Sequence, residues 1–142
     1  MAESHRWAGA ALSLLLAGGV ASAEPPPLDA PEFLEGMRQL EQELNLLQAG
    51  WLRNDYDSVR LAAEAIAESP DPPLGERRRI MQRAGAAVGA VSAAHGHLRE
   101  AAGELAEAAA HADDEAILRH HQRMLQTCIG CHALFRSGEK PR

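Results

Sequence analysis

The sequence has 142 residues and a formal net charge of −6 at pH 7; 46% of its residues are hydrophobic and only 4% are aromatic. This length predicts one domain with one hydrophobic core and argues against two domains. The acidic balance argues against a nucleic-acid partner, because phosphate binding needs a basic face. It would instead suit solubility and a basic protein partner.

The N-terminal residues have the pattern of a secretory signal peptide. His5 and Arg6 precede an apolar run from Trp7 to Val20, and the small residues Ala21, Ser22 and Ala23 follow it. The run is shorter than the roughly 20 residues that a bilayer span needs. We therefore predict that residues 1–23 are cleaved, that residues 24–142 form the mature domain, and that this domain is exported to the periplasm without a membrane span.

The first helix is predicted to begin at Pro31. Apolar residues then alternate in steps of four and three, as in an amphipathic helix with a bundle seam, at Phe33, Met37, Leu40, Leu44, Leu47 and Trp51. "RNDYD" interrupts this pattern, and "SVRLAAEAIAES" predicts a short second helix with Asp57 as its N-cap. The prolines of "SPDPP" end the second helix, because proline cannot continue the hydrogen-bond ladder.

A third helix is predicted to begin near Leu74 or Gly75 and to continue through an Ala-rich stretch to Ala112. Its interior glycines either permit close contact between helices or mark a bend; they are Gly85, Gly89, Gly96 and Gly103.

The fourth helix is predicted in "DDEAILRHHQRMLQTCIGCHALFR", capped by Asp113 and stopped by "SGEKPR". No stretch alternates with a period of two, so no strand is predicted. Four helices with short connections predict an all-α fold, an antiparallel up-down-up-down four-helix bundle.

The fourth helix carries the two cysteines of the chain, Cys128 and Cys131, and His132 follows them directly. Covalent haem attachment needs two thiols about one helical turn apart and an imidazole beside them, which is the spacing found here. A zinc clip needs four ligands, but the adjacent His120 and His121 point to different helix faces. A redox dithiol is expected at the start of a helix that follows a strand, whereas this motif ends a helix. Covalent haem is favoured, with zinc and a redox dithiol as the alternatives.

The signal peptide, the four-helix pattern and the C-x-x-C-H near the C-terminus resemble the class II cytochromes c, the cytochrome c prime family and its low-spin relatives. At residue level the resemblance is confined to "CIGCHALFR". It implies one haem c attached by thioether bonds to Cys128 and Cys131, with His132 as the proximal iron ligand and Arg136 packed near the haem. The chain departs from the family pattern in its few aromatic residues and its long Ala/Gly-rich third helix.

Members of this family differ at the sixth iron position, which is either open behind an apolar side chain or filled by a methionine of the first helix. In an antiparallel bundle, His132 near the C-terminal end of the last helix faces the first two turns after Pro31. Leu34 and Met37 lie there, and only Met37 carries a ligand atom, although it equally suits a place in the core. His121 lies roughly 16 Å along the helix from His132, at about 1.5 Å per residue, which is too far.

The start of the third helix is predicted at the same end of the bundle, with Met81 as an alternative distal ligand. A local positive patch there would suit the carboxylates of two haem propionates, or would be a solvated face; it comprises Arg77, Arg78, Arg79 and Arg83. His95, His97 and His111 belong to the later part of this helix, and we expect them at the surface or between helices.

The sequence therefore predicts an exported monohaem cytochrome that is not an enzyme and carries one electron between redox partner proteins. The alternative is a five-coordinate haem protein that binds nitric oxide or carbon monoxide behind Leu34. A third hypothesis is a structural or sensory helical bundle without haem. An exposed Ala-rich helix face would support a homodimer.

Overall fold

The computed structural model describes residues 27–136. This part of the chain is helical and contains no strand. Its elements are α1 (Pro31–Leu52), α2 (Tyr56–Ala67), α3 (Leu74–Ala84), the 3-10 helix η1 (Gly85–Ala87), α4 (Val88–Ala110) and α5 (Asp114–Arg136). The predicted all-α class is confirmed for these residues, whereas the predicted signal peptide and "SGEKPR" lie outside them.

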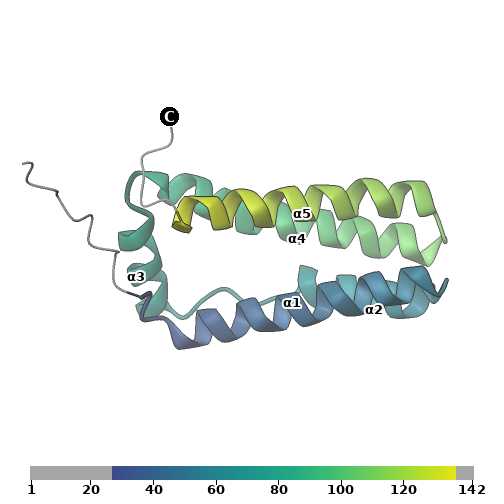
Figure 1. Cartoon of the computed structure of the whole chain (residues 1–142), viewed down its shortest axis with the longest axis horizontal. Coiled ribbons are helices and arrows are strands. Elements are labelled where there is room, and N and C mark those ends of the chain that lie inside the picture. Colours follow the sequence, from purple (N-terminus) through teal and green to yellow (C-terminus); the bar gives the residue numbers. More distant parts are fainter. Residues whose placement is uncertain (1–26, 137–142) are drawn as a thin grey trace, which may run out of the picture.

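The helices form a bundle in which α1 lies beside α2 and α4 lies beside α5 (Figure 1). The short helix α2 also packs on α4 and so joins the two pairs. At one end α3 crosses the bundle, close to the start of α1 and the end of α5 (Figure 1). In residues 27–136, no helix combines the length and the apolar character that a membrane crossing requires.

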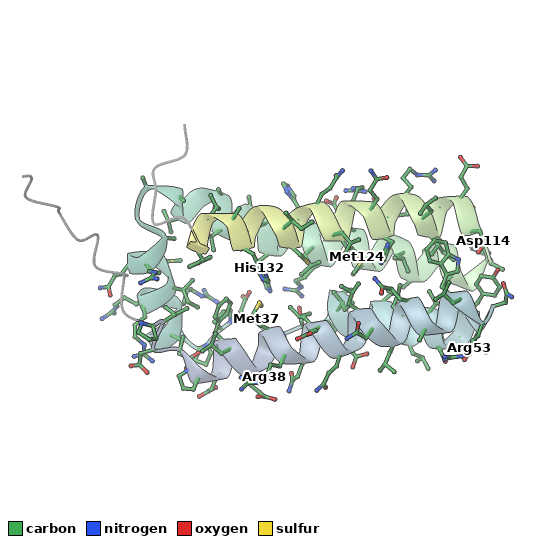
Figure 2. All side chains as sticks on the ribbon, in the orientation of Figure 1. Met37, Arg38, Arg53, Asp114, Met124 and His132 are labelled. Atoms are coloured by element: carbon green, nitrogen blue, oxygen red, sulfur yellow. The ribbon has the colours of Figure 1, made fainter. Side chains whose placement is uncertain are left out.

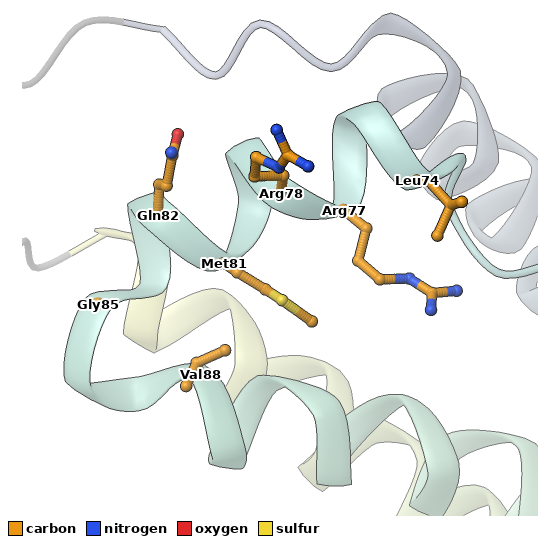
Figure 3. A pocket seen from close by; sticks show the side chains of 7 residues that line it. All are labelled: Leu74, Arg77, Arg78, Met81, Gln82, Gly85 and Val88. Carbon is orange, nitrogen blue, oxygen red and sulfur yellow. The ribbon is translucent and has the colours of Figure 1, made fainter.

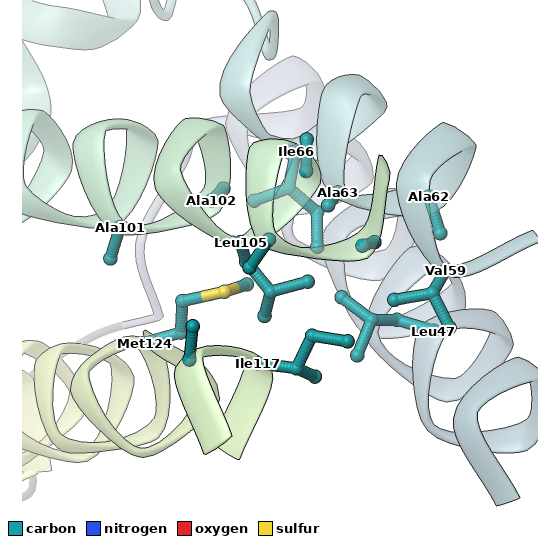
Figure 4. Close-up of a cluster of buried hydrophobic side chains, with 14 of the residues drawn as sticks. Leu47, Val59, Ala62, Ala63, Ile66, Ala101, Ala102, Leu105, Ile117 and Met124 are labelled. Atoms are coloured by element: carbon teal, nitrogen blue, oxygen red, sulfur yellow. The ribbon is translucent and has the colours of Figure 1, made fainter. Parts of the chain in front are cut away.

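The buried core (Figure 4) fills only part of the length of the bundle. Its largest fully buried side chains are Leu47, Ile66, Leu105, Ile117, Met124 and Val59, and small alanines of α2 and α4 pack between them. Toward α3 this core stops. No residue of α1 before Leu47 is buried, none of α4 before Leu98, and none of α5 from Leu125 to Phe135.

Helix boundaries follow local hydrogen bonds. The predicted first helix is confirmed from Pro31, and α2 ends at Ala67 before the prolines, as predicted. Asp113 caps α5 as predicted, because its Oδ1 accepts a hydrogen bond from Ala116 N at 3.0 Å. The predicted cap of α2 was wrong: Asp55, not Asp57, accepts the hydrogen bond from Ser58 N at 3.2 Å. The helix therefore begins earlier than predicted, and Asp57 lies in its first turn.

The predicted single third helix was also wrong, because the chain breaks at Gly85 into α3 and α4. Gly85 has φ +53° and ψ −121°, a conformation that residues with a side chain rarely adopt. Gly85 therefore marks a bend, which is one of the two roles expected for the glycines. The second expected role, close contact between helices, does not apply to Gly89, Gly96 or Gly103, because a methyl group added at any of them would meet no atom within 4 Å.

Two helix ends are capped by side chains from other helices. α1 has no side-chain cap of its own, and the buried carboxylate of Glu76 in α3 accepts hydrogen bonds from the backbone N–H groups of its first turn. Arg99 of α4 donates to the carbonyl of Ala67 at the end of α2, at 2.8 Å. These contacts satisfy backbone groups that a helix end leaves without partners.

Candidate functional site

The C-x-x-C-H residues lie on α5 near the end of the bundle that α3 crosses (Figures 1 and 2). Cys128, Cys131 and His132 share one side of the helix, because residues three and four apart are neighbours on a helix surface. Both cysteines are half-buried and free, and Cys128 packs against the edge of the core. His132 is exposed.

Burial raises the pKa of both thiols. For Cys128 the cause is desolvation, and for Cys131 desolvation is followed by repulsion from Cys128. Both thiols are therefore protonated at neutral pH in this environment. A redox dithiol requires the opposite shift, since the thiolate is the reactive form. The thiol environment thus disfavours the redox-dithiol alternative.

Met37 of α1 and His132 of α5 point toward one another in Figure 2. Met37 is half-buried, whereas Leu34, one helical turn earlier, has 41% of its surface exposed. Apolar side chains of both helices at this end are likewise only half-buried, and they include Phe33, Leu40, Leu134 and Phe135. Two thiols, an imidazole, a thioether and apolar surface thus gather where the buried core stops. The side chain of Arg136 lies outside the described part of the structure, so its contact with a haem stays a prediction.

The predicted arginine patch lies on α3 and is partly neutralised. Arg77 pairs with Asp71 at 3.1 Å, and Asp71 also contacts His95 at 3.3 Å. Arg79 approaches Asp29 at 3.9 Å. Arg77 and Arg79 therefore have carboxylate partners inside the chain.

Met81 lies apart from the C-x-x-C-H residues. It lines a hollow between α3 and the start of α4, together with Leu74, Arg77, Arg78, Gln82, Gly85 and Val88 (Figure 3). No residue of α1 or α5 lines this hollow. The structure therefore groups Met81 with Val88, and it gives no support to the alternative in which Met81 is the distal ligand.

Sequence reasoning missed the role of His121, which it considered only as a ligand of zinc or of haem iron. His121 is buried, forms a hydrogen bond of 3.1 Å with Gln48, and meets the ring of Trp51 edge-on at 6.1 Å between centroids. Burial lowers the pKa of this imidazole. The spacing of Ile117, His121 and Met124, in steps of four and three, is the sequence signal that would have placed His121 on the buried face of α5.

A polar cluster also joins the helices at the end opposite α3. The Nε1 of Trp51 donates to Asp114 at 2.8 Å, and the hydroxyl of Tyr56 donates to the same carboxylate at 3.1 Å. This hydrogen bond raises the pKa of Tyr56. The sequence pattern predicted Trp51 only as an apolar seam residue, so this link between α1, α2 and α5 was not predicted.

His95, His97 and His111 lie at the surface or between helices, as the sequence led us to expect. His95 links its helix to Asp71, and the exposed His111 lies 3.1 Å from Glu107 one turn away. Within residues 27–136, no group of three or more His, Cys, Asp or Glu side chains is arranged to hold a metal ion. The zinc alternative therefore finds no set of four ligands in this range.

No protein-family model, no curated protein and no solved structure matches this chain.

Proposed function

We propose that this chain is an exported monohaem c-type cytochrome that carries one electron between redox partner proteins and catalyses no reaction of its own. In this proposal it is a member of the class II cytochromes c, with the antiparallel up-down-up-down topology of that family. Residues 1–23 direct export to the periplasm.

One observation carries the proposal: the C-x-x-C-H residues lie where the buried core of the bundle stops. A bundle of this kind gains stability by burying apolar side chains, yet Phe33, Leu40 and Phe135 are only half-buried here. A flat apolar group bound between α1 and α5 would cover such side chains, and bundle cores are where helical proteins build cofactor sites. Haem therefore fits the residues that are present.

The chain supplies each contact that haem requires. Cys128 and Cys131 provide the two thiols for thioether bonds, His132 provides an imidazole for one side of the iron, and Met37 provides a thioether on the facing helix. Bound haem supplies the one-electron couple between ferric and ferrous iron. The half-buried apolar side chains around it exclude water, and burial of this kind tunes the reduction potential.

The direction of Met37 favours an electron carrier over a gas-binding protein. A methionine on the iron fills the sixth position, whereas a protein that binds nitric oxide or carbon monoxide leaves it accessible. Met37 points toward His132, and Leu34, the residue expected to guard an accessible site, is substantially exposed. The gas-binding function remains the second candidate, and the absorption spectrum separates the two.

The test is to express the full chain with the periplasmic haem-attachment machinery. We expect a mature protein that begins at Glu24, whose mass includes one haem and whose haem survives extraction with acidified acetone. The double variant Cys128→Ala/Cys131→Ala should lose the acid-stable haem, because no thioether bond can form. Met81→Leu is the matched control, since Met81 lies outside the site, and it should keep the haem. A wild-type protein without acid-stable haem would overturn the proposal.

A further inference from the structure

The hollow between α3 and α4 is lined by both apolar and basic side chains (Figure 3). We call the residues Leu74, Arg77, Arg78, Met81 and Val88 the α3 face. Leu74 is 80% exposed and Met81 is 42% exposed, although both are large apolar side chains. Exposed apolar residues that lie together with charged ones are typical of surfaces that bind other molecules.

The charge of α3 is opposite to that of the whole chain. The chain carries −6 overall, while α3 contains four arginines and one acidic residue. That acidic residue, Glu76, is buried and hydrogen-bonded to the start of α1 rather than to an arginine, and the four arginines outnumber it. Two of these arginines, Arg77 and Arg79, pair with Asp71 and Asp29. Within the described part of the chain, Arg78 makes no ion pair.

The α3 face lies at the same end of the molecule as the C-x-x-C-H residues. α3 crosses the end of the bundle at which α5 ends, and it packs on both α4 and α5 (Figure 1). A partner seated on α3 would therefore lie at the end of the molecule that bears Cys128, Cys131 and His132. Electron transfer between proteins needs a short path, so docking at this end is more productive than docking at the Asp114 end.

From these observations we infer that the α3 face is the docking surface for a redox partner with an acidic surface. This inference rests on the proposed function and names the kind of partner that exchanges electrons with it. The arginines of the α3 face steer the partner by long-range attraction, which raises the association rate. Its exposed apolar side chains then provide contact area that excludes water, as the centre of an interface does.

The inference is tested by how the rate of electron transfer to a charged oxidant changes with ionic strength. The positive charge of the α3 face and the negative net charge of the chain predict changes of opposite sign. The probes are two small oxidants, the anion hexacyanoferrate(III) and the cation tris(1,10-phenanthroline)cobalt(III). In each reaction ferrous haem gives one electron to the oxidant and becomes ferric, and the oxidant is reduced by that electron. Stopped-flow absorption gives the second-order rate constant as a function of ionic strength.

If electrons leave through the α3 face, oxidation by hexacyanoferrate(III) should slow as salt is added, despite the negative net charge. Arg78→Glu should lower this rate constant at low salt by about threefold or more. Arg119→Glu is the matched control, because it makes the same charge change at an exposed arginine of α5 near the Asp114 end. Arg119→Glu should change the rate constant with hexacyanoferrate(III) much less. The rate constant with the cationic oxidant should be higher in Arg78→Glu than in the wild type.

Two results would overturn the inference while leaving the proposed function intact. One is a rate with hexacyanoferrate(III) that rises with salt in the wild type, as the net charge alone requires. The other is an equal loss in Arg78→Glu and Arg119→Glu. A protein that has no haem absorption at all would instead refute the proposed function, and the docking surface with it.

Discussion

Glu76 of α3 holds the first turn of α1 through Phe33: its carboxylate accepts a hydrogen bond of 2.7 Å from the backbone N–H of Phe33. The other carboxylate oxygen accepts one of 3.0 Å from Glu32 N. The two partners are more than forty positions away in the sequence, so this contact fixes α3 against the helix that bears Met37. It also places a negative charge at the positive end of the α1 dipole, where it is stabilising.

Replacing Glu76 by Ala should therefore destabilise the protein. The loss leaves two N–H groups of α1 without an acceptor, and we expect a decrease in the free energy of unfolding of about 1–2 kcal/mol. Urea unfolding measures the decrease in the free energy of unfolding, and faster amide hydrogen exchange at Phe33 would show that the first turn of α1 is destabilised. Glu35→Ala is the control, because Glu35 is exposed and pairs only with Arg38 on its own helix. An equal effect of the two substitutions would contradict the capping role.

Gly85 should tolerate no side chain, for a reason that is purely conformational. An added methyl group would meet no atom within 4 Å, but φ is +53°. We expect Gly85→Ala to lower the free energy of unfolding by about 1–3 kcal/mol. Gly103→Ala is the matched control within α4, where the space is equally open and φ is not positive. It should stabilise the protein by about 0.5–1 kcal/mol, because alanine favours helix. Thermal unfolding of both variants would check the opposite signs.

His121 should make the stability of the protein depend on pH. Burial lowers its pKa in the folded protein below the ordinary value of 6.5. As the pH falls through 6.5, the unfolded chain takes up a proton that the folded protein refuses, so the free energy of unfolding decreases. The contribution of His121 is complete above this value and is lost below it.

The measurement is urea unfolding at about pH 7.5 and at about pH 5.5, on either side of the ordinary histidine pKa. His121→Gln cannot titrate and should show a smaller loss between the two conditions than the wild type. His111→Gln, a change at an exposed histidine, should leave the loss unchanged. Identical losses in the wild type and His121→Gln would contradict this role of His121.

Sequence patterns correctly predicted those helix boundaries that depend on residues close together in the chain. The steps of four and three from Phe33 to Trp51 gave α1 its correct start, and the prolines after α2 gave its end. Spacing did not locate the break in the third helix. Gly85, Gly89, Gly96 and Gly103 look alike in an alanine-rich sequence, and only the backbone angle distinguishes the one that bends the chain.

Contacts between distant residues were beyond the reach of sequence patterns. Glu76 resembles any acidic residue in the first turn of a helix, yet it caps a different helix. The C-x-x-C-H motif could be located from sequence, because its chemistry depends on residues within one turn. The partner across the bundle depends on the relative rotation of α1 and α5, and sequence left Leu34 and Met37 both available. The structure turns Met37 toward His132 (Figure 2).

Met37 decides between carrier and gas binder, so its replacement is the most informative variant within the proposed function. A thioether on ferric iron gives a low-spin spectrum and closes the sixth position to added ligands, whereas leucine excludes them by bulk alone. Met37→Leu should convert a low-spin spectrum to a high-spin one and let carbon monoxide bind the ferrous protein readily. Methionine and leucine have similar volumes, so the free energy of unfolding should fall by less than about 1.5 kcal/mol. Absorption spectra of both oxidation states, with and without carbon monoxide, provide the measurement.

Met81→Leu makes the same chemical change outside the site and should leave the spectrum low-spin. If Met37→Leu also stays low-spin, a different side chain occupies the sixth position and the role of Met37 is refuted. If the wild type itself is high-spin, Met37 does not reach the iron despite pointing toward His132. Leu34 then guards an accessible site, and Leu34→Ala should speed carbon monoxide binding because it removes that bulk. In that case the gas-binding function takes precedence over electron transfer, since an accessible sixth position is what a gas ligand requires.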